Sequence, residues 1–231
     1  MSAGVRIALI GMGKMGRALA ELAPERGLQV AATLGRGTPV TADSLRGAAV
    51  ALEFTEPAAA PANLRACAAA GCPVVVGTTG WYEQLPTIAV EFERAGTALL
   101  WAANFSLGVN LFLRIAAESA PALVAGGFDS HLVETHHARK KDAPSGTALA
   151  IADAVADAGA PRPAITSVRT GHVPGTHELI FDGPFEQVRL VHAARDRRAF
   201  ADGALAAARW LVGRRGVFTM ADVLAFPDGA R

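Results

Sequence analysis

The 231-residue sequence has little cysteine, almost no net charge and no long uninterrupted apolar run. Its two cysteines, Cys67 and Cys72, are too few and too close for a disulfide framework, so we expect structural thiols in a reducing compartment. A formal net charge of +1 provides no general basic field, which argues against nucleic acid as a partner. No uncharged apolar run reaches the roughly 18 residues that a membrane span requires. No basic leader followed by an apolar stretch begins the chain. We therefore expect a cytoplasmic protein with no membrane partner.

Apolar residues are abundant enough for a folded core. Hydrophobic residues make up 51% of the sequence and charged residues 19%, which is ordinary for a globular protein and unlike a disordered chain. The length allows one large domain or two modest ones.

Short apolar runs alternate with helix-like stretches over the first hundred residues. The expected strands are 5–10, 28–34, 50–54, 73–76 and 98–102. A helix is expected to follow residues 11–16 and to end near Glu25, and two more helices are expected over 57–70 and 81–95. Strands that alternate with helices of this length predict β-α-β units and a mainly parallel sheet.

The pattern changes after Asn104. A long helix over 106–123 is apolar on most faces, so we expect it to be buried. A strand over 128–135, a helix from Pro144 to about Asp157, and three strands near 165–169, 177–181 and 188–192 follow, which predicts a second α+β domain with an antiparallel or mixed sheet. A last helix over 198–212 is expected to return to the first domain, before a short tail. The predicted domains are therefore 1–105 with 197–231, and 106–196.

A glycine motif lies directly between the first predicted strand and helix. Gly11-Met12-Gly13-Lys14-Met15-Gly16 matches G-x-G-x-x-G. Such glycines permit a tight turn and close approach of the backbone, and the following helix N-terminus offers amides and a positive dipole to a pyrophosphate. The alternative is a glycine-rich turn without a ligand, but its place in the first α/β unit favours a dinucleotide site.

The end of the second predicted strand bears on the choice between NADH and NADPH. An acid that binds the ribose is expected about 20 residues beyond the glycine motif, yet none occurs between Gln29 and Thr41. Arg36 is instead placed to meet a 2′-phosphate, and Lys14 could assist it. NADPH is therefore favoured over NADH, with a solvated loop charge as the alternative reading of Arg36.

A dense basic segment marks the second domain. His136 and His137 are followed at once by Arg139, Lys140 and Lys141. A solvated charge run is the usual interpretation, but here Ser145-Gly146-Thr147 follows at a predicted helix N-terminus that can bind a carboxylate. Gly77-Thr78-Thr79-Gly80, after the fourth strand, is a second such place. Two possible anion-binding segments and a lysine indicate a small substrate with two carboxylates.

The remaining histidines carry weaker signals. His131 is more simply structural, Lys141 a solvated charge, and His172, His177 and His192 are not expected to be catalytic. No metal site is expected, because the two adjacent histidines would point to opposite faces of a strand.

The combination of these motifs resembles one enzyme family. Glu134-Thr135-His136-His137-Ala138-Arg139-Lys140-Lys141-Asp142-Ala143-Pro144-Ser145-Gly146-Thr147-Ala148 looks like the signature E-x-H-H-x-x-K-x-D-A-P-S-G-T-A. With 11–16, 53–55, 77–80 and 104–110 in the same order, the sequence resembles the 4-hydroxy-tetrahydrodipicolinate reductases, also called dihydrodipicolinate reductases. The resemblance implies NAD(P)H-dependent reduction of that compound, or of its dehydrated form, in lysine and diaminopimelate biosynthesis. It also implies a Rossmann-type domain, a mixed α+β domain for substrate binding and oligomerisation, and a homotetramer.

The resemblance also implies roles for individual residues. His136 would be the catalytic acid, and Lys140 would polarise or protonate the imine nitrogen and pair with a carboxylate. The residues implied to hold the two carboxylates are His137, Thr79, Ser145, Gly146 and Thr147. The cofactor-binding residues are Gly11, Gly13, Lys14, Met15, Arg36, Phe54, Gly77, Thr79, Ala103 and Phe105, with Arg197 and Phe200 near the hinge. The glycine loop is one residue shorter than the family's commoner form, and Glu53 stands where many members have Asp.

Two other functions remain open at this point. One is another NAD(P)-dependent oxidoreductase of a small imine or amino dicarboxylate, such as an aspartate dehydrogenase. The other is a non-catalytic dinucleotide-sensing module whose basic segment binds a partner protein. The joined H-H-x-x-K and D-A-P-S-G-T motifs favour the reductase, because neither alternative is expected to carry them.

Overall fold

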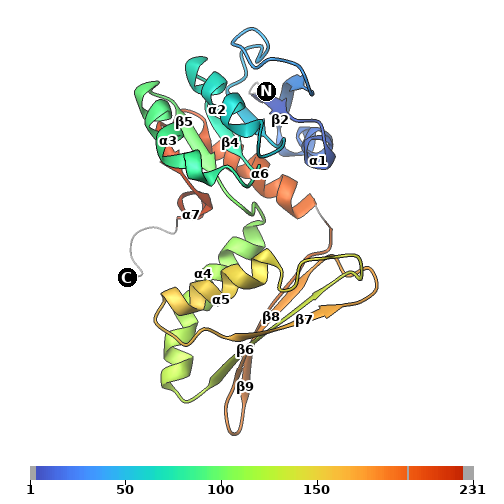
Figure 1. Cartoon of the computed structure of the whole chain (residues 1–231), viewed down its shortest axis with the longest axis vertical. Helices are drawn as coiled ribbons and strands as arrows, with labels where there is room; N and C mark the ends of the chain where they lie inside the picture. The colour runs from blue at the N-terminus through green and yellow to red at the C-terminus, as the bar shows by residue number, and fades with distance from the viewer. Residues whose placement is uncertain (1–3, 197, 226–231) are drawn as a thin grey trace. The chain divides into compact units, whose positions relative to one another are not determined.

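The computed structural model describes residues 4–196 and 198–225. The backbone divides into two compact units, Met1–Ser106 with Phe200–Arg231, and Leu107–Ala199 (Figure 1). They are called unit 1 and unit 2 below.

Unit 1 is built on a six-stranded sheet. Its elements are β1 (Val5–Ile10), α1 (Lys14–Leu22), the 3-10 turn η1 (Pro24–Arg26), β2 (Leu28–Leu34), β3 (Val50–Glu53), α2 (Ala60–Ala69), β4 (Val74–Val76), η2 (Tyr82–Gln84), α3 (Leu85–Arg94), β5 (Ala98–Trp101), most of α6 (Arg198–Leu211), β10 (Gly216–Phe218) and α7 (Met220–Val223). The strand order is β10-β5-β4-β3-β1-β2, and every neighbouring pair is parallel. The prediction of a mainly parallel sheet is confirmed.

Helices lie on both faces of this sheet because its strands alternate their apolar side chains. Ala8 and Ile10 of β1 belong to the core that contains Leu64 of α2 and Phe92 of α3. Ile7 and Leu9, which point to the other face, are also fully buried. Figure 1 shows α2 and α3 in front of the sheet and α6 behind it. Burial on both faces explains why these strands read as continuous apolar runs.

The sixth strand is a correction to the sequence analysis, which expected five strands and a short tail. β10 joins the edge of the sheet beside β5, with Gly216 paired to Ala98 and Phe218 to Leu100. Three residues are too few to show a periodicity in the sequence. The strand is anchored by tertiary contact instead, since the rings of Trp210 and Phe218 meet edge to face at 5.1 Å.

Unit 2 is a four-stranded mixed sheet with two helices. Its elements are α4 (Leu107–Ala125), β6 (Asp129–His136), α5 (Gly146–Asp157), β7 (Ala164–Arg169), β8 (Thr176–Asp182) and β9 (Gln187–Ala193). The strand order is β7-β6-β8-β9; β6 and β7 are parallel and the other pairs antiparallel. The predicted mixed sheet is confirmed. Phe112 of α4 and Ile151 of α5 share one core with Leu132 of β6.

The expectation that the long helix α4 is buried holds for only one of its faces. Its buried residues, Val109, Phe112, Ala116 and Ala120, form a single stripe, and Ile115 is 49% exposed. The helix packs mainly against α5 and against β6, β8 and β9, which cover the side that carries this stripe. Among the described residues α4 is also the one helix whose length and hydropathy would allow it to cross a membrane.

The turn between β1 and α1 depends on two of its three glycines. Gly11 has φ +94°, and a Cβ there would lie 2.2 Å from the carbonyl oxygen of Phe54. A Cβ on Gly16 would lie 2.0 Å from the carbonyl oxygen of Gly11. Gly13, the N-cap of α1, has open space around the position of its Cβ. The chain itself therefore requires Gly11 and Gly16, whereas Gly13 leaves room for something else.

This difference can be measured. Gly11→Ala is expected to lower the free energy of unfolding by at least about 1–3 kcal/mol, because it adds a backbone clash to a positive φ. Gly13→Ser is expected to change it by less than about 0.5 kcal/mol, because serine is a good N-cap and meets no neighbour. Urea unfolding followed by circular dichroism measures both. Equal losses in the two variants would contradict this account of the turn.

Candidate active site

Unit 1 has a cavity of about 410 Å³ at the carboxyl ends of β1, β2 and β3. Four of the predicted cofactor residues line it: Gly11, Gly13, Arg36 and Phe54. The carboxyl ends of parallel strands beside a helix N-terminus are the usual place for a dinucleotide in such sheets. The open space at Gly13 is what a pyrophosphate would need for close approach to the backbone, so the residues present fit that group.

Two other predicted cofactor residues lie behind Phe54 rather than on the cavity wall. A Cβ on Gly77 would be 2.0 Å from the Phe54 ring, so the ring occupies the space that a side chain would fill. Phe105 is buried, and its ring centroid is 5.7 Å from that of Phe54. Gly77 and Phe105 therefore fix the position of Phe54.

The remaining predicted cofactor residues lie outside this cavity. Lys14, Thr79 and Ala103 are exposed, and Met15 and Phe200 are partly exposed. Arg197 lies outside the described residues. None of those five described side chains belongs to the wall of the cavity.

Arg36 has a partner that the sequence analysis missed. Its side chain is 92% exposed, and its Nη2 lies 3.7 Å from Oε2 of Glu56, which also lines the cavity. Glu56 follows the third strand, outside the segment from Gln29 to Thr41, and the fold brings it to the same cavity. Arg36 thus lies at the cavity mouth beside an acid.

Glu53, at the end of β3, connects residues that lie next to this cavity. Its fully buried carboxyl accepts hydrogen bonds from Thr55 Oγ1 and, at 3.1 Å, from Asn63 Nδ2. Burial raises the pKa of Glu53. The backbone N–H of Thr55 donates to Thr78 Oγ1 at 2.7 Å, which ties the glycine-threonine segment after β4 to the loop after β3.

In unit 2, the end of β6 carries a buried pair. Glu134 and His136 are two residues apart, so their side chains point to the same face of the strand. The Nδ1 of His136 is hydrogen-bonded to Oε2 of Glu134. Arg169, at the end of the neighbouring strand β7, donates from Nη2 to the other oxygen of Glu134 at 2.6 Å.

Ser145 closes this cluster and caps α5. Its Oγ accepts from the backbone N–H of Ala148 at 3.2 Å, and its own N–H points to Glu134 Oε1 at 3.3 Å. The hydroxyl also lies 3.2 Å from Nε2 of His177. Ser145 is therefore already engaged by the protein. The exposed Gly146 and half-buried Thr147 begin α5, where backbone N–H groups and the helix dipole favour an anion.

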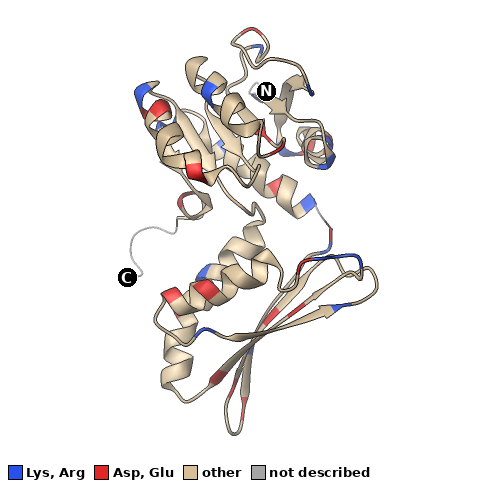
Figure 2. Cartoon of the chain, viewed as in Figure 1, with Lys and Arg blue, Asp and Glu red and all other residues tan. Residues whose placement is uncertain are grey.

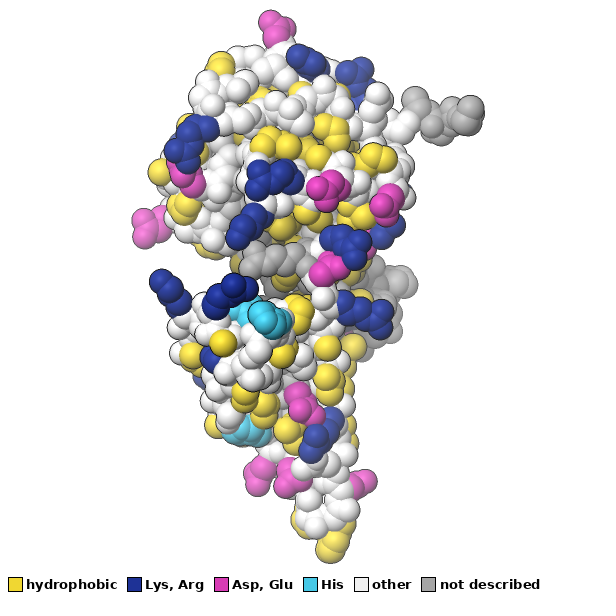
Figure 3. Space-filling view, turned by 90° about the vertical axis from the view of Figure 1, so that its right-hand side faces the viewer, with side chains coloured by type: hydrophobic (Ala, Val, Ile, Leu, Met, Phe, Trp, Pro, Cys, Tyr) yellow, Lys and Arg dark blue, Asp and Glu magenta, His cyan; other side chains and the backbone are white. Residues whose placement is uncertain are grey.

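Lys140 stands on the basic loop that follows β6. Its Nζ lies 2.8 Å from Oδ2 of Asp142, and its side chain is 22% exposed. The Nδ1 of His137 is buried and has no hydrogen-bond partner among the described residues. Figure 2 shows Lys and Arg on this loop, and Figure 3 shows a histidine beside basic side chains on one face of unit 2.

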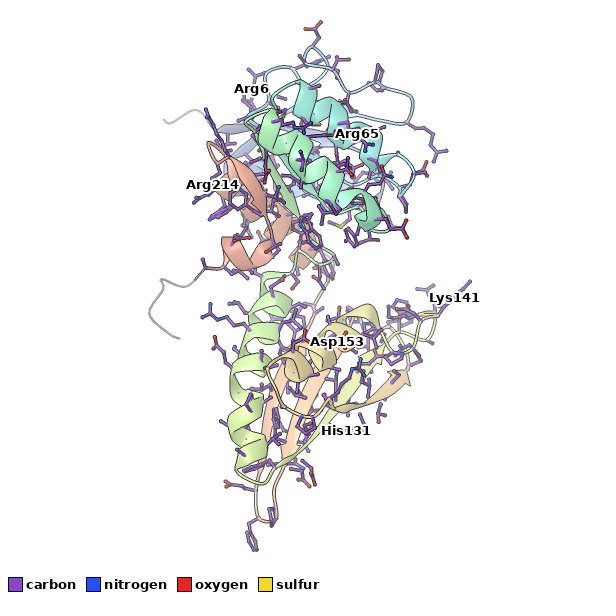
Figure 4. The ribbon with its side chains drawn as sticks, turned by 60° about the vertical axis from the view of Figure 1, so that its left-hand side comes forward. Arg6, Arg65, His131, Lys141, Asp153 and Arg214 are labelled. Atoms are coloured by element: carbon purple, nitrogen blue, oxygen red, sulfur yellow. The ribbon has the colours of Figure 1, made fainter. Side chains whose placement is uncertain are left out.

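Lys141 and His131 lie away from this cluster. In Figure 4, Lys141 points outward from the end of the basic loop, and His131 lies further back along β6. The Nε2 of His131 is 2.9 Å from Thr166 Oγ1, a contact within the sheet.

His177 is a member of the cluster that the sequence analysis did not select. It is 4% exposed, and its ring centroid is 5.3 Å from that of His136 at an interplanar angle of 74°. It pairs directly with Glu134 across β6 and β8. The alternation of His177, Leu179 and Phe181 in the sequence could have indicated that His177 is buried. The strand register that places His177 beside Glu134 could not be read from the sequence. Arg169 was missed for the same reason, because the pairing of β6 with β7 brings it to Glu134.

The electrostatics of the cluster are set by burial and by the ion pair. Burial alone would raise the pKa of Glu134, but hydrogen bonds from Arg169 and its other partners hold it at about 2. Burial lowers the pKa of His136, and the carboxylate of Glu134 opposes that shift. Burial, together with the neighbouring rings of His136 and His192, lowers the pKa of His177 to about 4.

The cluster is suited to handling a proton near a lysine. Glu134, His136 and His177 bring potential metal-binding atoms within 4.8 Å of one another, but a guanidinium already occupies Glu134, which disfavours a second cation there. We treat the group as a hydrogen-bonded array. A histidine held by a carboxylate can give or take a proton near neutral pH, and a lysine beside it can stabilise negative charge.

The similarity of this chain to known proteins extends over both units. The family described as dihydrodipicolinate reductase, N-terminus, matches residues 5–105, and that described as dihydrodipicolinate reductase, C-terminus, matches residues 108–224. The 4-hydroxy-tetrahydrodipicolinate reductase of Thiobacillus denitrificans is 39% identical, over 95% of this chain and 98% of that protein. That of Acidiphilium cryptum is 37% identical, over 96% and 98%.

A solved structure supports the fold. The dipicolinate-bound dihydrodipicolinate reductase from Paenisporosarcina sp. TG-14 superposes with a TM-score of 0.76 at 22% identity, covering 94% of this chain and 97% of that one. At that identity the likeness shows the fold, while the matched families and the close relatives decide the membership. This chain belongs to the dihydrodipicolinate reductase family.

Proposed function

We propose that this protein reduces 4-hydroxy-tetrahydrodipicolinate, or its dehydrated form, to tetrahydrodipicolinate with NAD(P)H, a step in lysine and diaminopimelate biosynthesis. The observation that carries the proposal is the hydrogen-bonded pair of Glu134 and His136. This pair lies near Lys140 of the basic loop and near the N-terminus of α5. Relatives that share the family across nearly the whole chain bear the name of this activity.

His136 is proposed as the acid of the reaction. When bound, NAD(P)H supplies a hydride to an unsaturated carbon of the substrate, and the electron pair displaced from the double bond must then be matched by a proton. His136, buried and hydrogen-bonded, can donate that proton. Lys140 stabilises the negative charge that develops during the transfer.

The substrate class follows from the anion-binding groups near His136. The N-terminal turn of α5, with Gly146 and Thr147, suits one carboxylate, and Lys140 and His137 offer further positive or donor groups. Ser145 supports the site by holding α5 against Glu134. Thr79, in the segment after β4, is proposed to contribute from unit 1. A dicarboxylate uses all of these groups.

We assign cofactor binding to residues 1–105 and 197–231, and substrate binding and oligomerisation to residues 106–196. The face of the unit 2 sheet that points away from α4 and α5 exposes apolar side chains, including Val168 and Val191, the latter 58% exposed. Apolar patches of this kind mark contact surfaces. They support a homo-oligomer, proposed here as a tetramer, working in the cytoplasm without nucleic-acid, membrane or metal partners.

An aspartate dehydrogenase or a non-catalytic dinucleotide sensor would share only part of these features. Both could use the cavity in unit 1, but neither requires a carboxylate-bound histidine beside Lys140. The assay that follows separates all three.

Purified protein is expected to oxidise NAD(P)H rapidly when freshly prepared 4-hydroxy-tetrahydrodipicolinate is added, as followed by loss of absorbance of the reduced cofactor. His136→Ala and Lys140→Ala are each expected to lower kcat/KM by about 100-fold or more, because each removes a group that acts in the transition state. Lys141→Ala is the matched control and should retain wild-type activity. Protein that binds nucleotide but oxidises neither cofactor would contradict the proposal.

We further propose that Arg36 favours NADPH. In that case Arg36→Ala should lower kcat/KM for NADPH by about 10- to 100-fold and leave that for NADH nearly unchanged, because only the 2′-phosphate loses a charge-assisted hydrogen bond. Steady-state kinetics with each cofactor measure this. Glu56→Gln, which removes the acid beside Arg36, should shift the ratio toward NADPH, and equal losses for both cofactors in Arg36→Ala would contradict the proposal.

A further inference from the structure

We propose that Glu134 is a positioning residue that holds His136 with its proton on Nδ1, so that the proton given to the substrate leaves from Nε2. This inference rests on the proposed role of His136 as the acid. It assigns a function to a buried carboxylate that does not itself reach the substrate.

The direction of the hydrogen bond follows from the state of the carboxylate. Glu134 is fully buried and pairs through Oε1 with Nη2 of Arg169 at 2.6 Å, so it is ionised. An ionised carboxylate has no proton to give and can only accept. The contact between Glu134 Oε2 and His136 Nδ1 is therefore an Nδ1–H donated to oxygen.

Arg169 is itself fixed, which keeps the carboxylate in place. The same Nη2 donates to the backbone carbonyl of Asp142 at 2.6 Å, and Nη1 donates to that of Val168 at 2.8 Å. The backbone N–H of Ser145 also points at Glu134 Oε1. The carboxylate is thus held from β6, β7 and the start of α5, and it cannot turn away from His136 without leaving a buried charge unpaired.

Two further contacts limit how the His136 ring can turn. His177 meets it edge to face with centroids 5.3 Å apart. A Cβ on Gly175 would lie 3.0 Å from His136 Nε2, so this backbone approaches the ring more closely than most residues would allow. The ring therefore has one orientation, with Nδ1 directed inward to the carboxylate.

Several charged or titratable groups act on His136 from the surrounding elements. Glu134 on the same strand favours the imidazolium, whereas Lys140 on the following loop and Arg169 on β7 oppose it. His177 on β8 adds a ring that stays neutral near pH 7, beside His192 on β9, and Asp142 pairs with Lys140. Glu134 is the acid in direct contact with the ring.

Proton transfer then follows a balanced sequence. The imidazolium of His136 carries protons on both nitrogens and gives the one on Nε2 to the reduced substrate. The neutral ring that remains keeps its Nδ1–H on Glu134, and solvent restores the proton on Nε2. Glu134 is never protonated, because Arg169 holds its charge throughout.

The kinetic test compares Glu134→Gln with Glu178→Gln. Glu178 directly follows His177 on β8, so its side chain points to the opposite face of the sheet, where it pairs with Arg189. Glu134→Gln removes the group that favours the imidazolium, so the fall in kcat at high pH should move to lower pH by about one unit or more. At pH 7 kcat should fall by about 10- to 100-fold, with KM for the substrate within about threefold of wild type.

Glu178→Gln should keep the wild-type kcat and pH profile. A wild-type pH profile in Glu134→Gln, or the same shift in Glu178→Gln, would overturn the proposal. A loss of activity in Glu134→Gln with an unshifted profile would also overturn it, since that is the result of a purely structural role.

A second measurement does not depend on how the variant folds or on which substrate is used. In wild-type protein with ¹⁵N-labelled histidine, the His136 signals, assigned by their absence in His136→Ala, should show a protonated Nδ1 and an unprotonated Nε2 once the ring is neutral. Protonation at Nε2, or a mixture of both forms, would overturn the proposal. If the protein proved to reduce another substrate, this NMR result would stand unchanged, so the two failures can be told apart.

Discussion

The ion pair between Glu134 and Arg169 is the interaction on which the geometry of unit 2 depends. A carboxylate that is fully buried is strongly destabilising unless each oxygen has a partner. Here those partners are His136 on β6, Arg169 on β7 and the N-cap of α5, so three separate elements converge on one carboxylate. These contacts favour the observed register of β6 against β7 and hold the start of α5 against the end of β6. The same contacts orient His136 and bring the anion-binding turn of α5 next to it.

In unit 1 the shape of the site depends instead on glycines, which have no side chain. Gly11 and Gly77 provide space that Phe54 occupies with its backbone and its ring, and Phe105 supports that ring from behind. The cavity at the ends of β1 to β3 has its shape because those positions lack a Cβ. Close packing of this kind tolerates little change, whereas the open space at Gly13 is available to a ligand.

Much of this could be predicted from the sequence, because the predictable features were local. The apolar runs of β1 to β5, the glycine turn after β1 and the helix start at Ser145 are each encoded within a few neighbouring residues. The features that were missed arise from contacts between distant segments. β10 is too short to carry a pattern, and the exposure of Ile115 on α4 depends on what the rest of the chain covers.

The candidate site shows the same limit. His136 and Lys140 stand in a recognisable motif, whereas His177 and Arg169 enter through pairing in the sheet that no spacing reveals. Glu134 was within the motif, but its connection to His136 became clear only from its burial and its partners. Glu56 likewise reaches Arg36 through the fold.

The most direct test of the account is a double-mutant cycle between Glu134 and His136, measured as kcat/KM at a single pH. Glu134→Gln is made in wild-type protein and in the His136→Gln background, and its penalty is compared between the two. If Glu134 acts through the histidine, its penalty should disappear once His136 has been replaced. An equal penalty in both backgrounds would show that Glu134 acts independently of His136, and would contradict the account.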